Sequence, residues 1–147
     1  MMTVRRAEAV WQGDLFTGSG TVSGVSTGLF TDLPVSWPSR TEEPGGRTSP
    51  EELLAAAHAS CFSMALSNNL AKAGTPAARL EVSAEVACEE VGDAWSVTSS
   101  ALSVRGTVPG ANEAGLREAA EGARDNCPIS RALKGNVEMT VEAKLVG

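Results

Sequence analysis

Residues 53–66 constrain the fold of this chain most strongly, because they predict a long helix with almost no polar face. Ser49 is a suitable N-cap, Pro50 suits the first helical position, and Glu52 follows the cap by three residues, as in a capping box. The pattern predicts a helix that ends near Ala73, before a Gly-Thr-Pro sequence. A helix that is apolar on nearly every side belongs in a core or at a subunit interface.

Before this helix, apolar residues alternate loosely between turn signals, which predicts a three-stranded antiparallel meander. We expect its strands within residues 4–11, 15–22 and 28–37. The Gly-Ser-Gly sequence at 18–20 is not followed by a helix, so it predicts a turn or a flexible strand rather than a nucleotide-binding loop. Residues 38–46 contain two prolines and are expected to form a polar loop.

After the helix, residues 80–88 alternate strictly and predict a half-buried strand with Cys88 on its core face. A turn at Gly92-Asp93 leads to a partner strand over 95–108. A second helix over 112–125, a short helix starting at Pro128 and a last strand over 137–145 complete the chain. The order βββ-α-ββ-α-β, without βαβ repeats, predicts an α+β fold with antiparallel sheets around long helices. At 147 residues we expect one domain, 1–147, with one principal core.

Composition excludes several function classes. The formal net charge of −6 argues against binding to polyanions or to a membrane surface. Aromatic residues make up 4% and tyrosine is absent, so platforms for stacking bases are not expected. No apolar signal-peptide segment follows the N-terminus, and the longest apolar stretch is too short to span a bilayer. We expect a cytoplasmic protein, in which a disulfide would be transient and catalytic rather than structural.

Peroxide reduction by a thiol requires five elements, and the sequence has a candidate for each. A thiolate attacks the peroxide, a cation stabilises the thiolate, and a carboxylate holds the cation. An apolar wall receives the alkyl group, and a second thiol resolves the sulfenic acid to a disulfide. The candidate thiolate is Cys61, the candidate cation is Arg40, and the candidate carboxylate is Glu51. The surroundings of Leu54, Phe62 and Met64 could form the apolar wall, and Cys127 is the candidate second thiol.

Two segments carry a family resemblance. Residues 48–66, TSPEELLAAAHASCFSMAL, and residues 126–130, NCPIS, resemble the two cysteine motifs of the OsmC/Ohr peroxidases. The expected order of strands and helices is similar to that family over essentially the whole chain. The resemblance implies a thiol-dependent hydroperoxide reductase of oxidative or osmotic stress defence, with Cys61 peroxidatic, Cys127 resolving, and Glu51 the family's glutamate. It also implies an intertwined homodimer with two active sites at its interface.

The resemblance also bears on substrates and partners. It implies organic hydroperoxides as substrates, with hydrogen peroxide left open, and a lipoyl-type or thioredoxin-like dithiol as reductant. No metal, haem or flavin is implied. The position of the arginine distinguishes the branches. The Ohr branch has it in the early strands, where residues 17–22 have none, whereas the OsmC branch has it before the long helix. Arg40 matches the OsmC position, and Arg47 remains an alternative.

Helix geometry adds an expectation about assembly. Glu51 and Cys61 are ten residues apart, which on one straight helix separates them by ~15 Å along the axis. If both serve one site, Glu51 must come from a partner subunit. Cys127 precedes Pro128 and is expected to be a helix N-cap, a position that favours the thiolate.

Each candidate also has a purely structural interpretation. Cys88 is expected to be a core residue. Glu51 could act only through its favourable interaction with the helix dipole at the N-terminus, and Arg40 could be a solvated charge. A single helical histidine such as His58 is usually packed and hydrogen-bonded, so we do not expect it to be catalytic.

Three other functions remain open. A non-enzymatic stress protein of the same fold could bind a small ligand while its cysteines stay reduced. A metal site could use three cysteines and one histidine, although no pair has C-x-x-C spacing. A cysteine hydrolase would need a histidine and an orienting residue outside the helix that carries Cys61.

Overall fold

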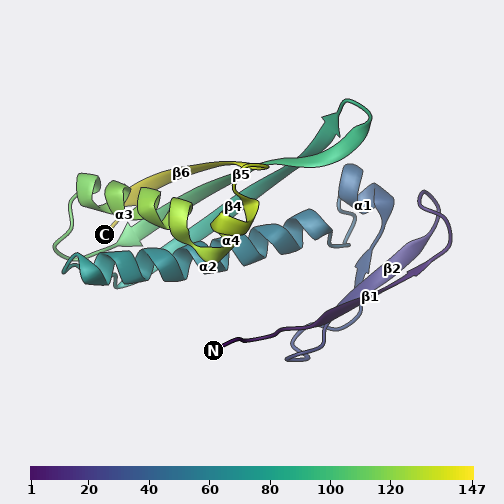
Figure 1. Ribbon diagram of the computed structural model, residues 1–147, viewed down its shortest axis with the longest axis horizontal. Helices are drawn as coiled ribbons and strands as arrows, with labels where there is room; N and C mark the ends of the chain where they lie inside the picture. The colour runs from purple at the N-terminus through teal and green to yellow at the C-terminus, as the bar shows by residue number, and fades with distance from the viewer. The chain divides into compact units, whose positions relative to one another are not determined.

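The computed structural model describes all residues from Met1 to Gly147. The chain divides into two compact units, residues 1–53 and residues 54–147, which are described separately. Figure 1 shows the ribbon, with β1 to α1 in the first unit and β4 to β6 in the second. The organisation as one domain stays a prediction.

The first unit contains the expected antiparallel meander. Its strands are β1 (Ala7–Gln12), β2 (Ser19–Gly24) and β3 (Leu33–Val35), paired in the order β1-β2-β3. The second strand begins later than predicted, because Asp14 organises a turn in front of it. The Asp14 carboxylate accepts hydrogen bonds from the backbone N–H groups of Phe16 and Thr17 and from the Thr17 hydroxyl. Such local bonds compete with the strand ladder.

The expected polar loop after β3 begins instead with a short helix, α1 (Trp37–Thr41). Ser36 is its N-cap, and Ser36 and Ser39 form a reciprocal capping box. Pro38 is compatible with this helix because it lies in the first turn, where no intrahelical N–H is needed. The prediction of a loop from residue 38 onward was therefore wrong for residues 38–41, and Arg40 lies on a helix.

The long helix is confirmed as α2 (Pro50–Lys72), which begins in the first unit and continues into the second. The backbone N–H of Glu52 donates to the Ser49 hydroxyl at 3.1 Å, as an N-cap requires. The Glu52 carboxylate accepts from the Thr48 hydroxyl at 2.6 Å, so the capping box is modified. Gly74 takes a φ of +85° beyond the C-terminal end, a conformation that glycine adopts without strain.

The second unit is built on a sheet of β4 (Arg79–Val91), β5 (Ala94–Thr107) and β6 (Glu138–Leu145), in that order. β4 and β5 form the expected hairpin around Gly92-Asp93. The α+β class is as predicted, but β6 pairs parallel to β5, so the expectation of antiparallel sheets was wrong for this pair. The physical reason is the crossover: the chain between these strands forms two helices and returns to the same end of the sheet.

These helices are α3 (Glu113–Asn126) and α4 (Pro128–Leu133). In Figure 1 they lie with α2 along the same face of the sheet. The core forms between the helices and this face. It contains three buried residues of α2, two of β5, Val108, three of α3, and a cysteine between α3 and α4: Phe62, Leu66, Leu70, Leu102, Val104, Val108, Leu116, Ala120, Ala123 and Cys127.

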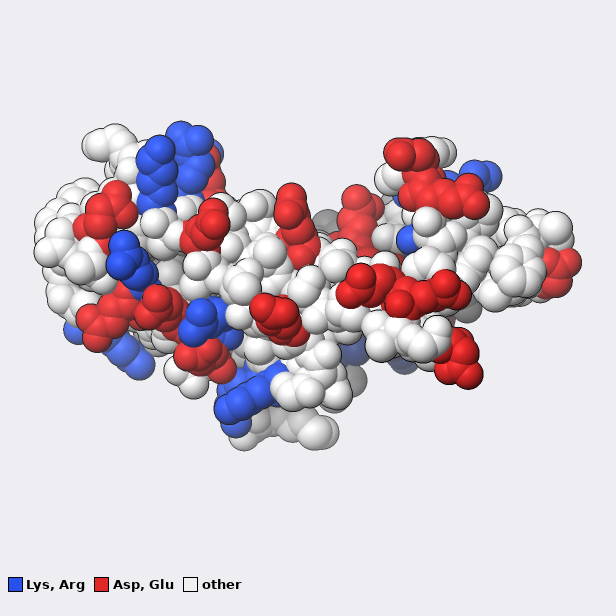
Figure 2. All heavy atoms as spheres, turned by 90° about the horizontal axis from the view of Figure 1, so that it is seen from above, with Lys and Arg blue, Asp and Glu red and all other residues white.

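The other face of this sheet carries charged residues. Exposed and half-buried residues alternate along β4, as predicted, and Glu81 lies directly opposite Arg105 of β5. On the side shown in Figure 2, acidic and basic side chains are interspersed and form no continuous basic surface. No helix of the chain is both long and apolar enough to cross a bilayer.

Candidate active site

Arg40 and Glu51 form an ion pair in the first unit. Arg40 Nε donates to Glu51 Oε1 at 3.0 Å, and Arg40 Nη2 lies 2.9 Å from the same oxygen. The Glu51 side chain is 9% exposed and the Arg40 side chain 35% exposed. A half-buried pair of this geometry fixes the direction of the guanidinium better than an exposed pair does. Arg47 lies in a turn closed by its N–H and the Pro44 carbonyl, so Arg40 is the partner of Glu51.

Arg40 also lies against an apolar hollow. Its guanidinium carbon is 5.9 Å from the Trp37 ring centroid, within cation–π range. The hollow has a volume of about 320 Å³ and is walled mainly by aromatic and aliphatic side chains. Its lining residues are Trp11, Leu15, Val35, Ser36, Trp37, Arg40 and Pro50. The sequence pattern gave no indication that Trp37 accompanies the arginine, because the helix that presents both residues was not expected.

Cys61 and Cys127 line one cavity of the second unit, with a volume of about 460 Å³. Cys61 comes from the middle of α2 and is partly exposed, whereas Cys127 lies between α3 and α4 and is fully buried. The remaining lining side chains are uncharged: Met64, Ala65, Asn68, Asn69, Ala123, Asn126 and Pro128. Two thiols that are 66 residues apart in sequence, by their numbers 61 and 127, therefore share one site.

The environment of Cys61 disfavours its thiolate within this unit. Burial raises the pKa of the Cys61 thiol, and the neighbouring Cys127 raises it further. The backbone N–H of Ile129 acts in the opposite direction and lowers the pKa. No basic side chain lines the cavity, so a cation that stabilised the Cys61 thiolate would have to come from elsewhere.

Cys127 has the predicted N-cap position. It precedes α4, with Pro128 in the first turn, and the backbone N–H of Ser130 donates to the Cys127 sulfur at 3.4 Å. The Ser130 hydroxyl lies 3.0 Å from the same sulfur. This hydroxyl is a functional candidate that sequence reasoning missed. The Cys-Pro-x-Ser spacing could have indicated this contact, because it places Ser130 at the third helical position, next to the N-cap Cys127.

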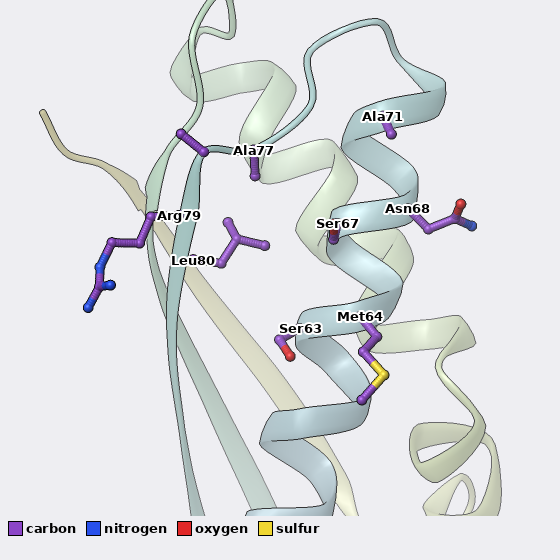
Figure 3. A pocket seen from close by; sticks show the side chains of 9 residues that line it. Ser63, Met64, Ser67, Asn68, Ala71, Ala77, Arg79 and Leu80 are labelled. Atoms are coloured by element: carbon purple, nitrogen blue, oxygen red, sulfur yellow. The ribbon is translucent and has the colours of Figure 1, made fainter.

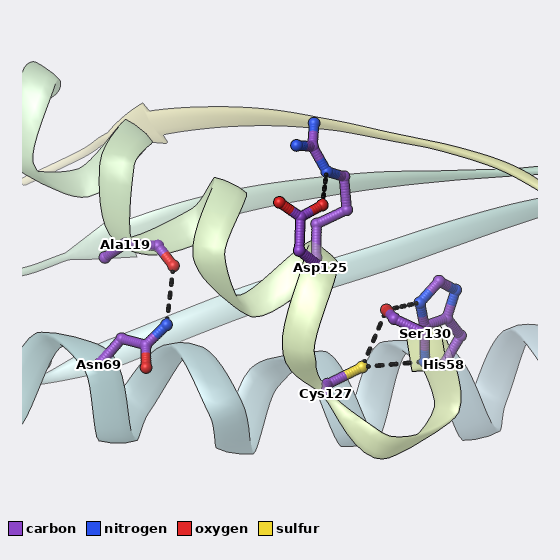
Figure 4. A network of polar contacts seen from close by, with 7 residues as sticks. His58, Asn69, Ala119, Asp125, Cys127 and Ser130 are labelled. Atoms are coloured by element: carbon purple, nitrogen blue, oxygen red, sulfur yellow. Dashed lines mark hydrogen bonds and ion pairs between the residues drawn. The ribbon is translucent and has the colours of Figure 1, made fainter. Parts of the chain in front are cut away.

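His58 is buried and hydrogen-bonded, as expected for a packed histidine, but its partners were not foreseen. Its Nδ1 lies 2.7 Å from the Ser100 hydroxyl of β5, and its Nε2 lies 2.8 Å from the Ser130 hydroxyl of α4. Burial lowers the pKa of His58 below its ordinary value of 6.5. Figure 4 shows Cys127, Ser130 and His58 adjacent to one another.

Cys88 does not line the cavity that Cys61 and Cys127 share. Cys88 is half-buried on the inner side of β4, in register with Val97 of β5. No group of three or more His, Cys, Asp or Glu side chains is arranged to hold a metal ion. A second hollow, of about 640 Å³, lies between α2 and the start of β4 (Figure 3). Residues of α2 that line it include Ser63, Met64 and Ser67.

Comparison with known proteins places this geometry in a family. Residues 43–142 match the family described as OsmC-like protein. The chain is 35% identical over 144 residues to peroxiredoxin OsmC of Escherichia coli strain K12, covering 97% of this chain and 99% of the relative. It is 30% identical over 137 residues to the organic hydroperoxide resistance protein of Xanthomonas axonopodis pv. citri, covering 86% of this chain and 93% of the relative.

Solved structures agree with the fold. The crystal structure of the organic hydroperoxide resistance protein OhrB of Bacillus subtilis superposes with a TM-score of 0.75 at 23% identity, covering 95% of this chain and 98% of that one. The family match spans the segment that carries Glu51, Cys61 and Cys127. The chain is a member of the OsmC-like protein family.

Proposed function

We propose that the protein is a thiol-dependent peroxidase that reduces organic hydroperoxides through Cys61 and Cys127. The observation that carries this proposal is the shared cavity of the two thiols, in which Cys61 is the accessible and Cys127 the buried partner. Relatives named peroxiredoxin OsmC and organic hydroperoxide resistance protein support the same chemistry.

The reaction has three balanced steps. The Cys61 thiolate attacks the terminal oxygen of the hydroperoxide ROOH, an S–O bond forms, the O–O bond breaks, and the alkoxide takes up a proton to leave as ROH. The Cys127 sulfur then attacks the Cys61 sulfenic acid, so that an S–S bond forms and water leaves. A dithiol finally reduces this disulfide, returns both thiols and becomes a disulfide itself.

In this mechanism Arg40 supplies the missing cation. Its positive charge would lower the pKa of Cys61 and polarise the O–O bond, opposing the effect of burial. Glu51 engages Nε and Nη2 of Arg40, which leaves Nη1 to meet the peroxide. The hollow beside Arg40 and Trp37 would receive the organic group of the substrate, which favours alkyl and aryl hydroperoxides over hydrogen peroxide.

We propose further that Arg40 and Glu51 reach Cys61 from a second copy of the chain, in a homodimer. Glu51 and Cys61 both lie on the continuous helix α2, so ~15 Å of helix axis separates them within one chain. The side of α2 that carries Met64, Ser67 and Ala71 supports the dimer. Met64 is 70% exposed there, although the helix is apolar in sequence, and a second copy would cover it.

A dithiol reductant of the lipoyl or thioredoxin-like type and a cytoplasmic location complete the proposal. Each reductant can deliver two thiols to an exposed disulfide by exchange. The partial exposure of Cys61 provides the sulfur that such a reductant can reach.

The first test is the intact mass of the reduced protein before and after one equivalent of cumene hydroperoxide, followed by peptide mapping. The expected product has lost two hydrogens, in a disulfide between Cys61 and Cys127. Cys61→Ser should abolish peroxide consumption, and Cys127→Ser should stop after one attack per site. Cys88→Ser is the matched control and should behave as wild type, because Cys88 lies outside the cavity. An unchanged mass with both thiols reduced would contradict the peroxidase and favour a ligand-binding protein.

A further inference from the structure

A continuous chain of polar side chains leads from the resolving cysteine into the core. The Cys127 sulfur lies 3.0 Å from Ser130 Oγ, Ser130 Oγ lies 2.8 Å from His58 Nε2, and His58 Nδ1 lies 2.7 Å from Ser100 Oγ. All four side chains have no exposed surface. Figure 4 shows the Cys127 end of this chain, which we call the histidine relay.

The histidine relay is assembled from separate parts of the fold. His58 comes from α2, Ser100 from β5, and Cys127 and Ser130 from the start of α4. Burying an imidazole and two hydroxyl groups is unfavourable unless each finds a partner, and here each contacts the next. An apolar side chain at position 58 would fill the same core without this requirement, so a structural role alone gives little reason for a histidine there.

We propose that His58, acting through the Ser130 hydroxyl, withdraws the proton of Cys127 and delivers a proton to the departing hydroxide when Cys127 resolves the Cys61 sulfenic acid. This inference rests on the proposed function and extends it, because His58 and Ser130 become the groups that move a proton in the second step. Neither side chain is needed for the attack of Cys61 on the peroxide.

The proton transfers balance. The Cys127 S–H donates to Ser130 Oγ while the Ser130 hydroxyl proton passes to His58 Nε2, which leaves a thiolate and an imidazolium. The thiolate attacks the sulfur of the sulfenic acid, the S–S bond forms, and the S–O bond breaks. The departing hydroxide takes a proton from the Ser130 hydroxyl while Ser130 Oγ takes one from His58 Nε2, and it leaves as water, so His58 ends neutral and no proton is consumed.

The geometry is compatible with the tautomer that this transfer needs. His58 Nε2 can accept from Ser130 while Nδ1–H donates to Ser100 Oγ, because a hydroxyl group can serve as acceptor or donor. Burial keeps the pKa of His58 low, so the ring is neutral and able to accept a proton at neutral pH. The Ser130 backbone N–H, 3.4 Å from the Cys127 sulfur, stabilises the thiolate once it forms.

The test separates the two chemical steps in a single turnover of the reduced full-length protein with cumene hydroperoxide. Peroxide loss reports attack by Cys61, and the mass shift on dimedone trapping reports sulfenic acid. Quenched samples report the Cys61–Cys127 disulfide. We expect Ser130→Ala and His58→Gln to slow disulfide formation by ~10²-fold or more, the usual contribution of a general base, with accumulation of sulfenic acid. Ser130→Thr keeps the hydroxyl and should restore the rate to within about tenfold of wild type.

Ser100→Ala provides the contrast with a purely structural network. It removes an equally buried hydroxyl from the other ring nitrogen but leaves the path from Cys127 to His58 intact. We expect its disulfide rate to stay at least about tenfold above that of Ser130→Ala. In addition, disulfide formation in wild type should be slower in D₂O, and this isotope effect should shrink in Ser130→Ala.

Several outcomes would overturn the proposal. These are disulfide formation at the wild-type rate in Ser130→Ala, equal slowing in Ser100→Ala and Ser130→Ala, or no rescue by Ser130→Thr. Circular-dichroism melts establish whether each variant is folded. If His58→Gln does not fold, the proposal is tested with Ser130→Ala and Ser130→Thr alone. Failure of wild type itself to form any sulfenic acid or disulfide would refute the proposed peroxidase, which is distinguishable from failure of the relay.

Discussion

Arg40 directs both Nε and Nη2 to a single oxygen of Glu51, Oε1, at 3.0 and 2.9 Å, while Oε2 is buried and accepts no hydrogen bond. The carboxylate therefore holds the guanidinium along one edge and sets the direction of its third nitrogen. We propose that the pair serves to orient the Arg40 guanidinium toward the peroxide.

Replacing the carboxylate should misdirect the arginine. We expect Glu51→Gln to slow peroxide attack by Cys61 by about tenfold, and Arg40→Gln to slow it by ~10²-fold or more, because the second change removes the charge itself. Arg40→Lys should rescue little, since an ammonium cannot reproduce the planar geometry. Stopped-flow measurement of peroxide consumption checks these rates, with Arg47→Gln as the matched control. If Arg47→Gln slows peroxide consumption as much as Arg40→Gln does, the assignment of this role to Arg40 is contradicted.

Mixing two inactive variants tests whether the site is shared between subunits. If Arg40 acts on Cys61 of the other copy, a Cys61→Ser chain and an Arg40→Gln chain form a mixed dimer with one complete site. Random exchange of equal amounts should restore about a quarter of the wild-type sites. If both residues act within one chain, no mixed dimer contains a complete site and activity stays at the level of the unmixed variants. Analytical ultracentrifugation provides the oligomeric state in parallel.

The hollow beside Arg40 should control the substrate. We expect Trp37→Ala to lower kcat/KM for cumene hydroperoxide by about tenfold, because the loss of aromatic contact area corresponds to roughly 1–3 kcal/mol of transition-state binding. Hydrogen peroxide makes no such contact, so its kcat/KM should change less. Parallel kinetics with both peroxides measure this difference. Equal losses for the two substrates would mean that Trp37 acts through the position of Arg40 instead.

Burial of His58 should make stability depend on pH. The pKa of His58 in the folded chain is lowered below the ordinary value of 6.5. At pH values between the folded-state and unfolded-state pKa, the unfolded chain therefore binds a proton at this ring and the folded chain does not. Stability should therefore decrease as the pH falls below about 6.5, and increase as the pH rises. Thermal melts between about pH 7.5 and 5.5 measure this slope, which should be smaller in His58→Gln. A slope unchanged by the substitution would place the pH dependence on other groups.

The core of the second unit should respond to loss of volume. Leu66 is fully buried between α2 and the sheet, and Leu66→Ala should lower the free energy of unfolding by ~2–5 kcal/mol. Ser103 lies on the exposed face of β5, so Ser103→Ala should change this free energy by no more than ~0.5 kcal/mol. Urea denaturation followed by circular dichroism compares the two variants. Equal effects would contradict the assignment of the core to the helix-covered face.

Local patterns in the sequence were sufficient for most of the secondary structure. The N-cap at Ser49 and the glycine at position 74 bracket α2, and strict alternation defines β4, because these signals depend on neighbours within a few residues. The same local logic placed Cys127 as a cap before Pro128. It failed at α1, because residues 38–46 were expected to form a polar loop, although the first turn of a helix accepts a proline such as Pro38.

The sequence by itself determined the two thiols, the acid and the candidate cations, because the two cysteine motifs and their spacing are local features of the chain. Only the tertiary structure decided which side chains meet. It brings Cys127 to Cys61, selects Arg40 over Arg47 as the partner of Glu51, and makes β6 parallel to β5. It also joins His58 to Ser100 and Ser130, which are 42 and 72 residues away in sequence. Such contacts depend on how the helices pack onto the sheet, and no pattern of nearby residues specifies them.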